Sequence, residues 1–258
     1  MEFSGKNILV VGASSGMGRT ISLRFARAGA RVAVTARRAS MLQDLVKTIE
    51  RENGVGLALP ADATDEHAAA DVVDKVVESF GGIDMVLLNA GGAPAIYMPK
   101  MNAREVKFYM QSNYDSVVNY LFPVLEHMKQ RQGGLVVHTN SLGGFYGVPL
   151  QGPYCAAKAA ARLLIDTCRI EFEQFGIRFV SLYPGFIATE ATKGDGMPAP
   201  GEISEEEAVN YMVDAIRRED WDFMFPPHAA ANALRAMQLP KPELNQYLKK
   251  RIFEGTPT

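Results

Sequence analysis

Short apolar runs that alternate with longer helical segments constrain this chain more than any other feature. The runs Asn7–Val11, Arg31–Ala36 and Asp84–Leu88 are rich in Val, Leu and Ala, without regular alternation between apolar and polar residues. Strands of that kind occur in parallel sheets that helices cover on both faces. The other expected strands are Gly56–Leu59, Leu135–Thr139, Ile177–Leu182 and Trp221–Phe225. The pattern predicts an α/β fold with a doubly wound parallel sheet of about seven strands, in a single domain covering residues 1–258.

The segments between these runs show the periodicity of apolar residues that is typical of helices. The expected helices are Gly16–Gly29, Ser40–Glu52 with Ser40 as N-cap, Asp65–Phe80, Asn102–Gln130, Tyr154–Phe175 and Ser204–Arg218. Residues 190–203 show no such pattern, and because long loops in compact domains are often lids, we expect this loop to cover the substrate. Residues 226–258 are expected to form a C-terminal helical extension, as a small cap or as a contact between subunits.

Composition and charge narrow the class of function. The 258 residues carry a net charge of −2, which offers no basic surface for nucleic acid or anionic lipid. No apolar stretch is long enough for a membrane span, and a strand expected from Asn7 onward leaves no room for a signal peptide. Cys155 and Cys168 fall in one predicted helix, too far apart to bridge, so free thiols in a reducing cytoplasm are expected.

A glycine-rich loop, GASSGMG at residues 12–18, joins the first predicted strand to the first helix. Its glycines permit a tight turn, a close approach of backbone to a ligand, and close packing of the helix on the strand. The free N–H groups and the dipole of the helix then favour a pyrophosphate. A tight turn without a ligand is the other interpretation, although the position between strand and helix favours a dinucleotide. The candidate contacts are Gly12, Ser14, Ser15, Gly16, Met17 and Gly18.

The second predicted strand ends in TARR, residues 35–38, without the acid that would bind ribose hydroxyls. A carboxylate would repel a 2′-phosphate, whereas a guanidinium holds it through two hydrogen bonds. We therefore expect NADP(H), bound by Arg37 and Arg38 with help from Ser14, unless the two arginines are solvated charges in a turn. Asp62 follows the third strand and is expected either to accept from the adenine amino group or to cap a turn.

Tyr154 and Lys158 lie at the start of a predicted helix that Pro153 helps to begin. Residues at i and i+4 share a helix face, and helical side chains lean toward the N-terminus, so Lys158 is expected to reach toward Tyr154. A nearby ammonium and the positive helix end favour the phenolate, so a lowered Tyr154 pKa and a proton-transferring role are expected. A surface hydrogen bond is the alternative for such a pair taken alone.

Ser141 and Asn113 complete the candidate catalytic group. Ser141 follows the fifth predicted strand, at the carboxyl edge where open α/β sheets bind ligands, and its hydroxyl is expected to hold a substrate oxygen. Asn113 interrupts the apolar stripe of the long helix, so its amide needs polar partners. Either a bound water or a position at a helix end or edge would satisfy that need.

Together these motifs resemble the short-chain dehydrogenase/reductase family, in order and spacing over about residues 6–190. The matching residues are Gly12, Gly16, Gly18, Asn89-Ala90-Gly91, Asn113, Ser141, Tyr154, Lys158 and Pro184-Gly185. The resemblance implies a Rossmann-like sheet and an oxidoreductase that interconverts a carbonyl and an alcohol by hydride transfer with NADP(H).

The resemblance also implies a role for each site residue. Tyr154 would act as general acid/base, Ser141 would orient the carbonyl, and Lys158 would bind the nicotinamide ribose and lower the tyrosine pKa. Asn113 would hold a water in a proton relay. The cofactor contacts implied beyond the glycine loop are Arg37, Arg38, Asp62, Ala63, Asn89, Ala90, Gly91, Tyr154, Lys158, Pro184, Gly185, Ile187 and Thr189.

Two residues depart from the family pattern. Val11 stands where the family usually has Thr, and Leu88 where it usually has Asn. The threonine hydroxyl normally ties the first loop to the loop after the fourth strand. In this chain we expect an apolar contact to replace that hydrogen bond, and the affinity for the cofactor can change as a result.

The residues after Ser141 are expected to line the substrate pocket. They are Gly143, Gly144, Phe145, Tyr146 and Val148. Their apolar and aromatic character favours a hydrophobic carbonyl compound over a sugar. Apolar residues lie on the outer faces of the two long helices, and because similar helices pair across two-fold axes in the family, the resemblance implies a homodimer or homotetramer. These residues are Val118, Phe122, Val124, Leu163 and Ile170.

Other functions remain as alternatives or are excluded. A non-catalytic NADP-binding regulator on the same fold would typically lack Tyr154 or Lys158, whereas an epimerase or dehydratase would reuse the tyrosine. A metal site is not expected, because the histidines are far apart in the sequence. They are His67, His127, His138 and His228. Nor does Ser141 stand in the Gly-x-Ser-x-Gly motif of a serine hydrolase.

Overall fold

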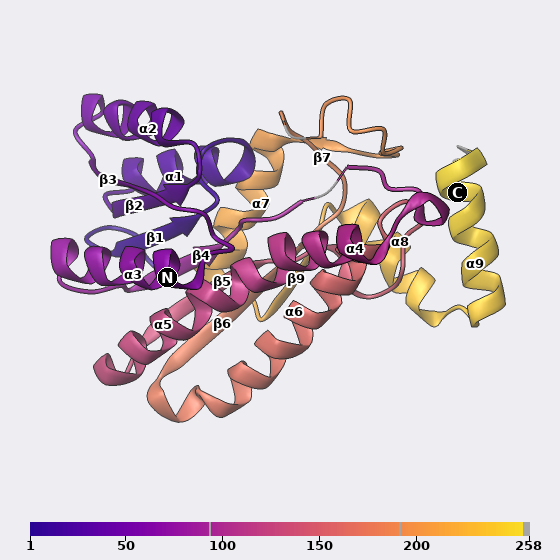
Figure 1. Ribbon diagram of the computed structural model, residues 1–258. Coiled ribbons are helices and arrows are strands. Elements are labelled where there is room, and N and C mark those ends of the chain that lie inside the picture. The colour runs from indigo at the N-terminus through magenta and orange to yellow at the C-terminus, as the bar shows by residue number, and fades with distance from the viewer. Residues whose placement is uncertain (93, 191, 255–258) are drawn as a thin grey trace.

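A sheet of seven parallel strands runs through the molecule in the order β3-β2-β1-β4-β5-β6-β9 (Figure 1). The computed structural model describes residues 1–92, 94–190 and 192–254. The strands of this sheet are β1 (Asn7–Val11), β2 (Arg31–Ala36), β3 (Val55–Pro60), β4 (Met85–Leu88), β5 (Gly134–Thr139), β6 (Ile177–Pro184) and β9 (Asp222–Phe225). The predicted doubly wound, Rossmann-like parallel sheet is confirmed, with strand ends within two residues of those expected.

Helices cover both faces of the sheet. They are α1 (Gly16–Arg27), α2 (Ala39–Arg51), α3 (Glu66–Phe80), α4 (Ala103–Met110), α5 (Ser116–Arg131), α6 (Gly152–Glu171), α7 (Glu205–Arg218), α8 (Pro227–Gln238) and α9 (Lys241–Lys249). Residues from α1, α2 and α7 pack on one face of the sheet, and residues from α3, α5 and α6 pack on the other.

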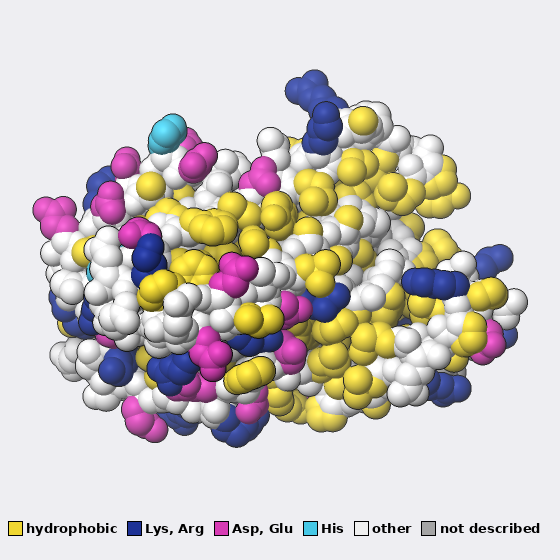
Figure 2. Space-filling model, turned by 90° about the horizontal axis from the view of Figure 1, so that it is seen from below, with side chains coloured by type: hydrophobic (Ala, Val, Ile, Leu, Met, Phe, Trp, Pro, Cys, Tyr) yellow, Lys and Arg dark blue, Asp and Glu magenta, His cyan; other side chains and the backbone are white. Residues whose placement is uncertain are grey.

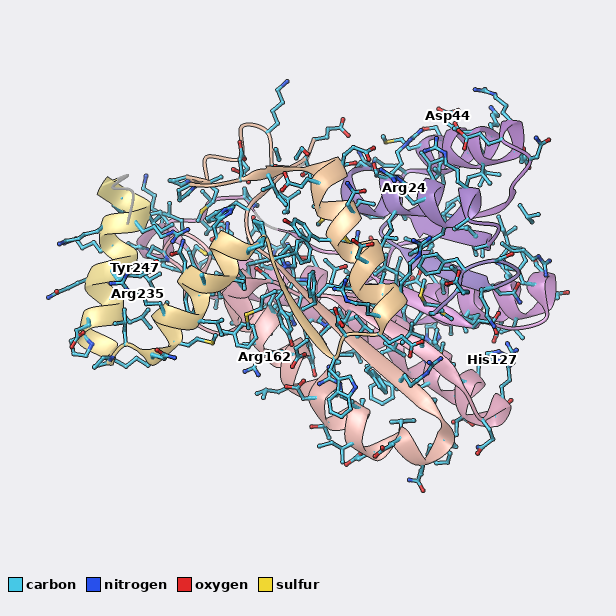
Figure 3. All side chains as sticks on the ribbon, turned by 180° about the vertical axis from the view of Figure 1, so that it is seen from behind. Arg24, Asp44, His127, Arg162, Arg235 and Tyr247 are labelled. Carbon is cyan, nitrogen blue, oxygen red and sulfur yellow. The ribbon has the colours of Figure 1, made fainter. Side chains whose placement is uncertain are left out.

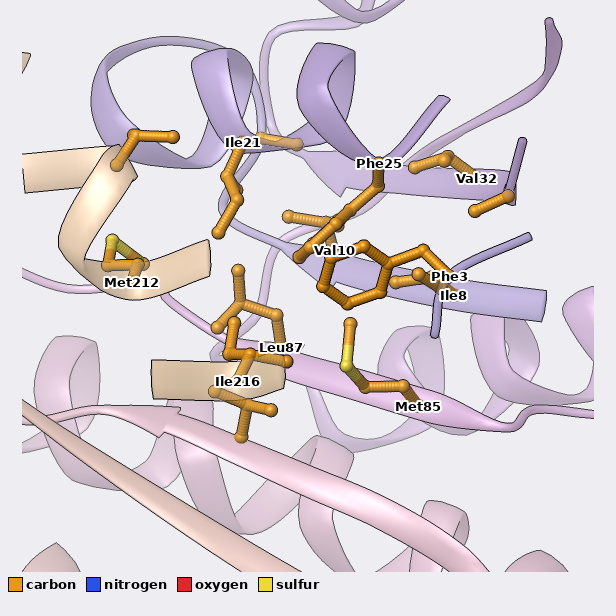
Figure 4. Close-up of a cluster of buried hydrophobic side chains, with 14 of the residues drawn as sticks. Phe3, Ile8, Val10, Ile21, Phe25, Val32, Met85, Leu87, Met212 and Ile216 are labelled. Atoms are coloured by element: carbon orange, nitrogen blue, oxygen red, sulfur yellow. The ribbon is translucent and has the colours of Figure 1, made fainter. Parts of the chain in front are cut away.

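Successive residues of one strand point to opposite faces of the sheet. Ile8 and Val10 of β1 belong to the cluster under α1 and α7, which Figure 4 shows, while Leu9 and Val11 belong to the other cluster. Because both faces are covered, the residues that point to either face lie in an apolar environment. This is why the strands read as continuous apolar runs.

The glycine loop places α1 against the carboxyl ends of the strands. Gly12 has φ 88°, and a Cβ there would lie 2.8 Å from the backbone of Ala90. A Cβ on Gly18 would lie 2.1 Å from the carbonyl oxygen of Gly12. Only glycine permits this approach, so the loop holds the start of α1 close to β1 and β4. The strand order reverses between these two strands, where open α/β sheets bind ligands.

The long helix expected over Asn102–Gln130 is interrupted. Residues Gln111–Asp115 form a π-helical turn, η2, between α4 and α5, and Asn113 lies in it. The periodicity of the sequence cannot reveal the extra residue of such a turn, and π turns are frequent at functional sites. The expected N-cap at Ser40 is also wrong, because α2 begins at Ala39 with Arg38 in the cap position.

Two segments beyond the central sheet contain the residues that were expected to form a lid and a tail, and the lid role stays a prediction. Short strands β7 (Ile187–Ala188) and β8 (Ile203–Ser204) pair with each other. The loop between them contains most of residues 190–203, the segment expected to form the lid. Ala191 lies outside the described residues, as do residues 255–258 of the tail. The tail forms α8, α9 and a π turn, η5 (Lys250–Glu254). None of the helices in the described ranges combines the length and hydropathy that a membrane crossing requires.

Candidate active site

One cavity of about 740 Å³ opens at the carboxyl ends of the strands and brings most of the predicted site residues together. The predicted residues that line it are Gly12, Ser14, Ser15, Gly16, Met17, Arg37, Arg38, Asp62, Ala63, Asn89, Ala90, Gly91, Ser141, Gly143, Tyr146, Val148, Tyr154, Lys158, Pro184, Gly185, Ile187 and Thr189. Segments far apart in the sequence therefore contribute to one site.

Four predicted residues do not line the cavity. Gly18 and Gly144 are packing positions, where a Cβ would meet the Gly12 carbonyl and the Asn140 side chain. Asn113 is completely buried behind the wall. Phe145, expected in the substrate pocket, instead packs on Tyr183 with its ring centroid 4.8 Å away, because an apolar cluster with α8 lies on that side.

Tyr154 and Ser141 face each other across the start of α6. The Ser141 Oγ accepts a hydrogen bond from the Gly143 N–H at 3.1 Å, and the hydroxyl is also hydrogen-bonded to Tyr154. Burial raises the pKa of Tyr154 to about 12, and the Ser141 hydrogen bond offsets only part of that effect. The phenol is therefore protonated at neutral pH in the protein without cofactor.

Lys158 is buried beneath the tyrosine. Its Nζ donates a hydrogen bond to the carbonyl oxygen of Thr139 at 2.8 Å and lies 5.7 Å from the centroid of the Tyr154 ring. Burial lowers the pKa of Lys158 to about 8. The expected lowering of the Tyr154 pKa is not found, because the ammonium is bound to Thr139 and desolvation of the phenolate dominates.

The buried lysine makes stability depend on pH. Its pKa is about 8 in the folded chain, against 10.5 when unfolded, so between these values the unfolded chain binds more protons. The free energy of unfolding should therefore rise with pH in this window, by about 2 kcal/mol from pH 8 to pH 10. Urea unfolding of wild type and Lys158→Met without cofactor measures it. The free energy of unfolding of the wild type should rise relative to that of the variant as pH increases. A difference between the two free energies that stays constant with pH would contradict the expectation.

Asn113 fixes the loop that follows β4. Its Oδ1 accepts a hydrogen bond from the Gly92 N–H at 2.6 Å, and its Nδ2 donates to the carbonyl oxygens of Gly92 at 3.1 Å and Tyr109 at 3.0 Å. The π turn presents the amide to this loop. The amide therefore holds the wall of the cavity, and the relay water expected from the sequence stays a prediction.

At the opposite end of the cavity, a guanidinium and two hydroxyls form one polar cluster. Arg38 donates to the Oγ of Ser14 through Nη2 at 2.8 Å and Nε at 3.1 Å, and to the Oγ of Ser15 at 2.5 Å. Hydrogen bonds from Thr64 lower the pKa of Asp62, so Asp62 has the turn-capping contact considered in the sequence. The charge of the exposed Arg37 makes a smaller contribution to that lowering.

Residues 6–197 match the family model for short chain dehydrogenases. The chain belongs to the short-chain dehydrogenase family. An uncharacterised oxidoreductase of Myxococcus xanthus is 31% identical over 241 residues, which cover 93% of this chain and 95% of that protein. The family places the chain among oxidoreductases that use a nicotinamide dinucleotide.

Solved structures of short-chain dehydrogenases have the same architecture. The alcohol dehydrogenase of Thermococcus sibiricus, complexed with 5-hydroxy-NADP, has a TM-score of 0.76 and 26% identity, covering 85% of this chain and 96% of that chain. A short chain dehydrogenase/reductase of Burkholderia phymatum, in complex with NAD, has a TM-score of 0.82 at 20% identity, covering 90% of this chain and 93% of that chain. The second likeness shows the shared fold.

The cavity fits the dinucleotide that short-chain dehydrogenases bind. Among the described residues, the buried Asn89 Oδ1 and Thr139 Oγ1 have no hydrogen-bond partner, and both residues line the cavity. Ser15, the N-cap of α1, makes no side-chain capping bond, so the first N–H groups of that helix remain available to a phosphate. Unpaired acceptors and donors of this kind need a polar ligand or water.

The two departures from the family pattern form an apolar contact, as expected. Val11 and Leu88 are register partners on β1 and β4 and are buried in the same hydrophobic cluster. The two loops remain linked, because the Nδ2 of Asn89 donates to the carbonyl oxygen of Gly12 at 3.3 Å. The side chain one position beyond Leu88 therefore supplies a hydrogen bond between the loops.

Sequence reasoning missed several residues of this short-chain dehydrogenase site. Asn140 bridges the fifth strand to α6, accepting from the Ser141 N–H at 2.8 Å and donating to the Lys158 carbonyl at 3.0 Å. Its place next to Ser141 was the available signal. The other missed cavity residues include Phe108, Ser112, Thr139, Gln151, Leu248, Arg251 and Ile252. The last three come from the tail, which no local pattern connects with the site.

Proposed function

We propose that this protein is an NADP(H)-dependent oxidoreductase that interconverts a carbonyl compound and the corresponding alcohol, with Tyr154 transferring the proton. The observation that carries the proposal is the convergence of Ser141, Tyr154 and Lys158 at the wall of one cavity. The same cavity reaches the glycine loop and the arginine cluster, so one ligand can span both.

In reduction, the Tyr154 hydroxyl donates its proton to the carbonyl oxygen while the Ser141 hydroxyl orients that oxygen by hydrogen bonding. When bound, a nicotinamide cofactor would supply the hydride for reduction and would take it up in the reverse reaction. The raised pKa of Tyr154 keeps the phenol in the donating form at neutral pH. Lys158, held by Thr139, places a positive charge below the ring and is available to the nicotinamide ribose.

The preference for a 2′-phosphate rests on Arg37, Arg38 and Ser14. All three line the cavity, and the guanidinium of Arg38 is already ordered on the Ser14 hydroxyl. The strand end has no acid to bind ribose hydroxyls. The 5-hydroxy-NADP complex of the related alcohol dehydrogenase supports the same choice.

A screen of NADPH oxidation against aldehydes, ketones and quinones tests the proposal, with Tyr154→Phe as the inactive control. We expect hydrophobic carbonyl compounds to be reduced and sugars to react poorly, because apolar side chains line much of the cavity. Absence of turnover across all three classes would overturn it. A non-catalytic regulator, or an epimerase or dehydratase on this fold, would then be the function to test.

The protein is also proposed to be cytoplasmic and a homodimer or homotetramer. Phe122 of α5 and Leu163 and Ile170 of α6 are 47%, 58% and 76% exposed, whereas Val124, expected on the same surface, is buried in the core. Figure 2, a view from below, shows hydrophobic side chains between scattered charges on that side of the molecule. A second copy would cover the exposed residues.

Light scattering at micromolar concentration should give two or four times the 28.2 kDa mass of one chain. The double variant Leu163→Asp/Ile170→Asp should dissociate, because it would bury two charges in the interface. Leu234→Asp, at a position on α8 that is 51% exposed, is the control and should keep the wild-type mass. A wild type that stays at the mass of one chain would contradict the expectation.

A further inference from the structure

The cavity continues past the catalytic residues to the C-terminal helices. Leu248 of α9 and Arg251 and Ile252 of η5 line it. Figure 3 shows Tyr247 of α9 at the end of the molecule opposite Asp44 of α2. The tail therefore forms part of the wall of the active-site cavity.

Apolar side chains surround this part of the cavity. Tyr146 packs against the cluster that contains the buried Leu248, and Ile252 is 4% exposed. The N–H of Val148 donates to the Sγ of Cys155, the residue that follows the catalytic tyrosine. The apolar wall thus runs from the neighbourhood of Tyr154 to the C-terminal helices, and an apolar chain would be desolvated along it.

Arg251 places a positive charge at the end of this wall. Its Nη1 donates to the Tyr247 hydroxyl at 2.9 Å, which orients the guanidinium and leaves further N–H donors. The charge acts on the Tyr146 phenol, where it offsets part of the rise in pKa caused by burial. Among the carboxylates of residues 1–92, 94–190 and 192–253, none forms an ion pair with Arg251.

The other charged side chains that line the cavity have hydrogen-bond partners or lie in other parts of it. Lys158 is bound to Thr139, while Arg37 and Arg38 lie at the cluster beside the glycine loop. Two carboxylates, Asp195 and Glu202, line the cavity from the loop between β7 and β8. The Oδ1 of Asp195 accepts from the Met197 N–H at 2.7 Å, and Glu202 is exposed. Arg251 therefore remains as the cation for an anionic group of the substrate.

We propose that the substrate is a carbonyl compound with an apolar chain that ends in a carboxylate, and that Arg251 binds this carboxylate. The carbonyl lies at Ser141 and Tyr154, and the chain follows the apolar wall. The inference rests on the proposed function, because it assumes that the reacting carbonyl is held by these two residues. A guanidinium can bind a carboxylate through two parallel hydrogen bonds.

Straight-chain ω-oxo carboxylates and their methyl esters, matched in length over a series, test the proposal. With NADPH, the wild type should show a kcat/KM for the best acid about tenfold or more above that for its ester, mainly through a lower KM. Arg251→Gln should remove this preference by lowering kcat/KM for the acid about tenfold or more relative to that for the ester, while Arg251→Lys keeps part of it. Lys249→Gln, an exposed position at the end of α9, is the matched control and should keep the preference.

Calorimetry with the Tyr154→Phe variant and NADP⁺ measures binding without turnover. Tighter binding of the acid than of the ester supports the inference if this difference is lost in Tyr154→Phe/Arg251→Gln. That result supports the inference even if the wild type reduces neither compound. In that case it is the proposed function that fails. Equal binding and turnover of acid and ester overturns the inference and leaves the proposed function standing. A preference that survives Arg251→Gln, or no binding of either compound at any length, also overturns it.

Discussion

Tyr154→Phe should lower kcat by about 10²- to 10⁴-fold and leave NADPH binding nearly unchanged. The ring keeps its place above Lys158, and only the transferable proton is lost. Because the pKa of Tyr154 is raised to about 12, the wild-type phenol carries that proton throughout the neutral range. Steady-state rates on a good carbonyl substrate and titration of NADPH fluorescence measure the two quantities separately.

Tyr146→Phe is the matched control for this experiment. Tyr146 lines the same cavity, and burial likewise raises its pKa to about 12. Loss of its hydroxyl should change KM by no more than about tenfold and spare kcat, because the residue packs against the C-terminal helices. Substantial activity in Tyr154→Phe, or an equal loss in both variants, would refute the assignment of the proton donor.

The second large effect concerns the choice of cofactor. We expect kcat/KM with NADPH to exceed that with NADH by about 10- to 1000-fold, since each charge-assisted hydrogen bond to the 2′-phosphate contributes about 1.5–3 kcal/mol. Arg37→Asp should reverse the preference by removing a guanidinium and repelling the phosphate. Arg37→Ala should only weaken it, because Arg38 and Ser14 form a second contact group at this end of the cavity.

Arg51→Asp provides the control for charge alone. Arg51 is exposed at the end of α2 and does not line the cavity, so the same change of charge there should leave the cofactor ratio near its wild-type value. The Arg37→Asp effect should also shrink as salt rises, because exposed charges are screened. An unchanged NADPH/NADH ratio in Arg37→Asp would mean that Arg37 is a solvated charge and would remove the main support for NADP(H).

Local patterns were sufficient for the strands, the glycine loop and the pairing of Tyr154 with Lys158 on one helix. Each depends on residues close together in the sequence: apolar runs for buried strands, glycines where a Cβ would clash, and a spacing of four on a helix. The carboxyl ends of parallel strands meet at one edge, so Ser141 could also be placed near the site.

Contacts between distant segments decided what the sequence could not. The π turn at Asn113 depends on hydrogen bonds to the loop after β4, and the clustering of Phe145 depends on helix α8. Periodicity carries no information about either partner. The same holds for Arg251, whose place in the cavity wall follows from how the C-terminal helices pack near Tyr146.

The acid–base properties of the site were also decided by tertiary structure. The spacing of Tyr154 and Lys158 predicts an ammonium that lowers the tyrosine pKa, yet Lys158 donates to Thr139 and burial raises that pKa. Sequence alone therefore determined that Ser141, Tyr154 and Lys158 share the site, because that follows from the fold class and local spacing. Only the tertiary structure determined their protonation, because desolvation depends on every segment that encloses them.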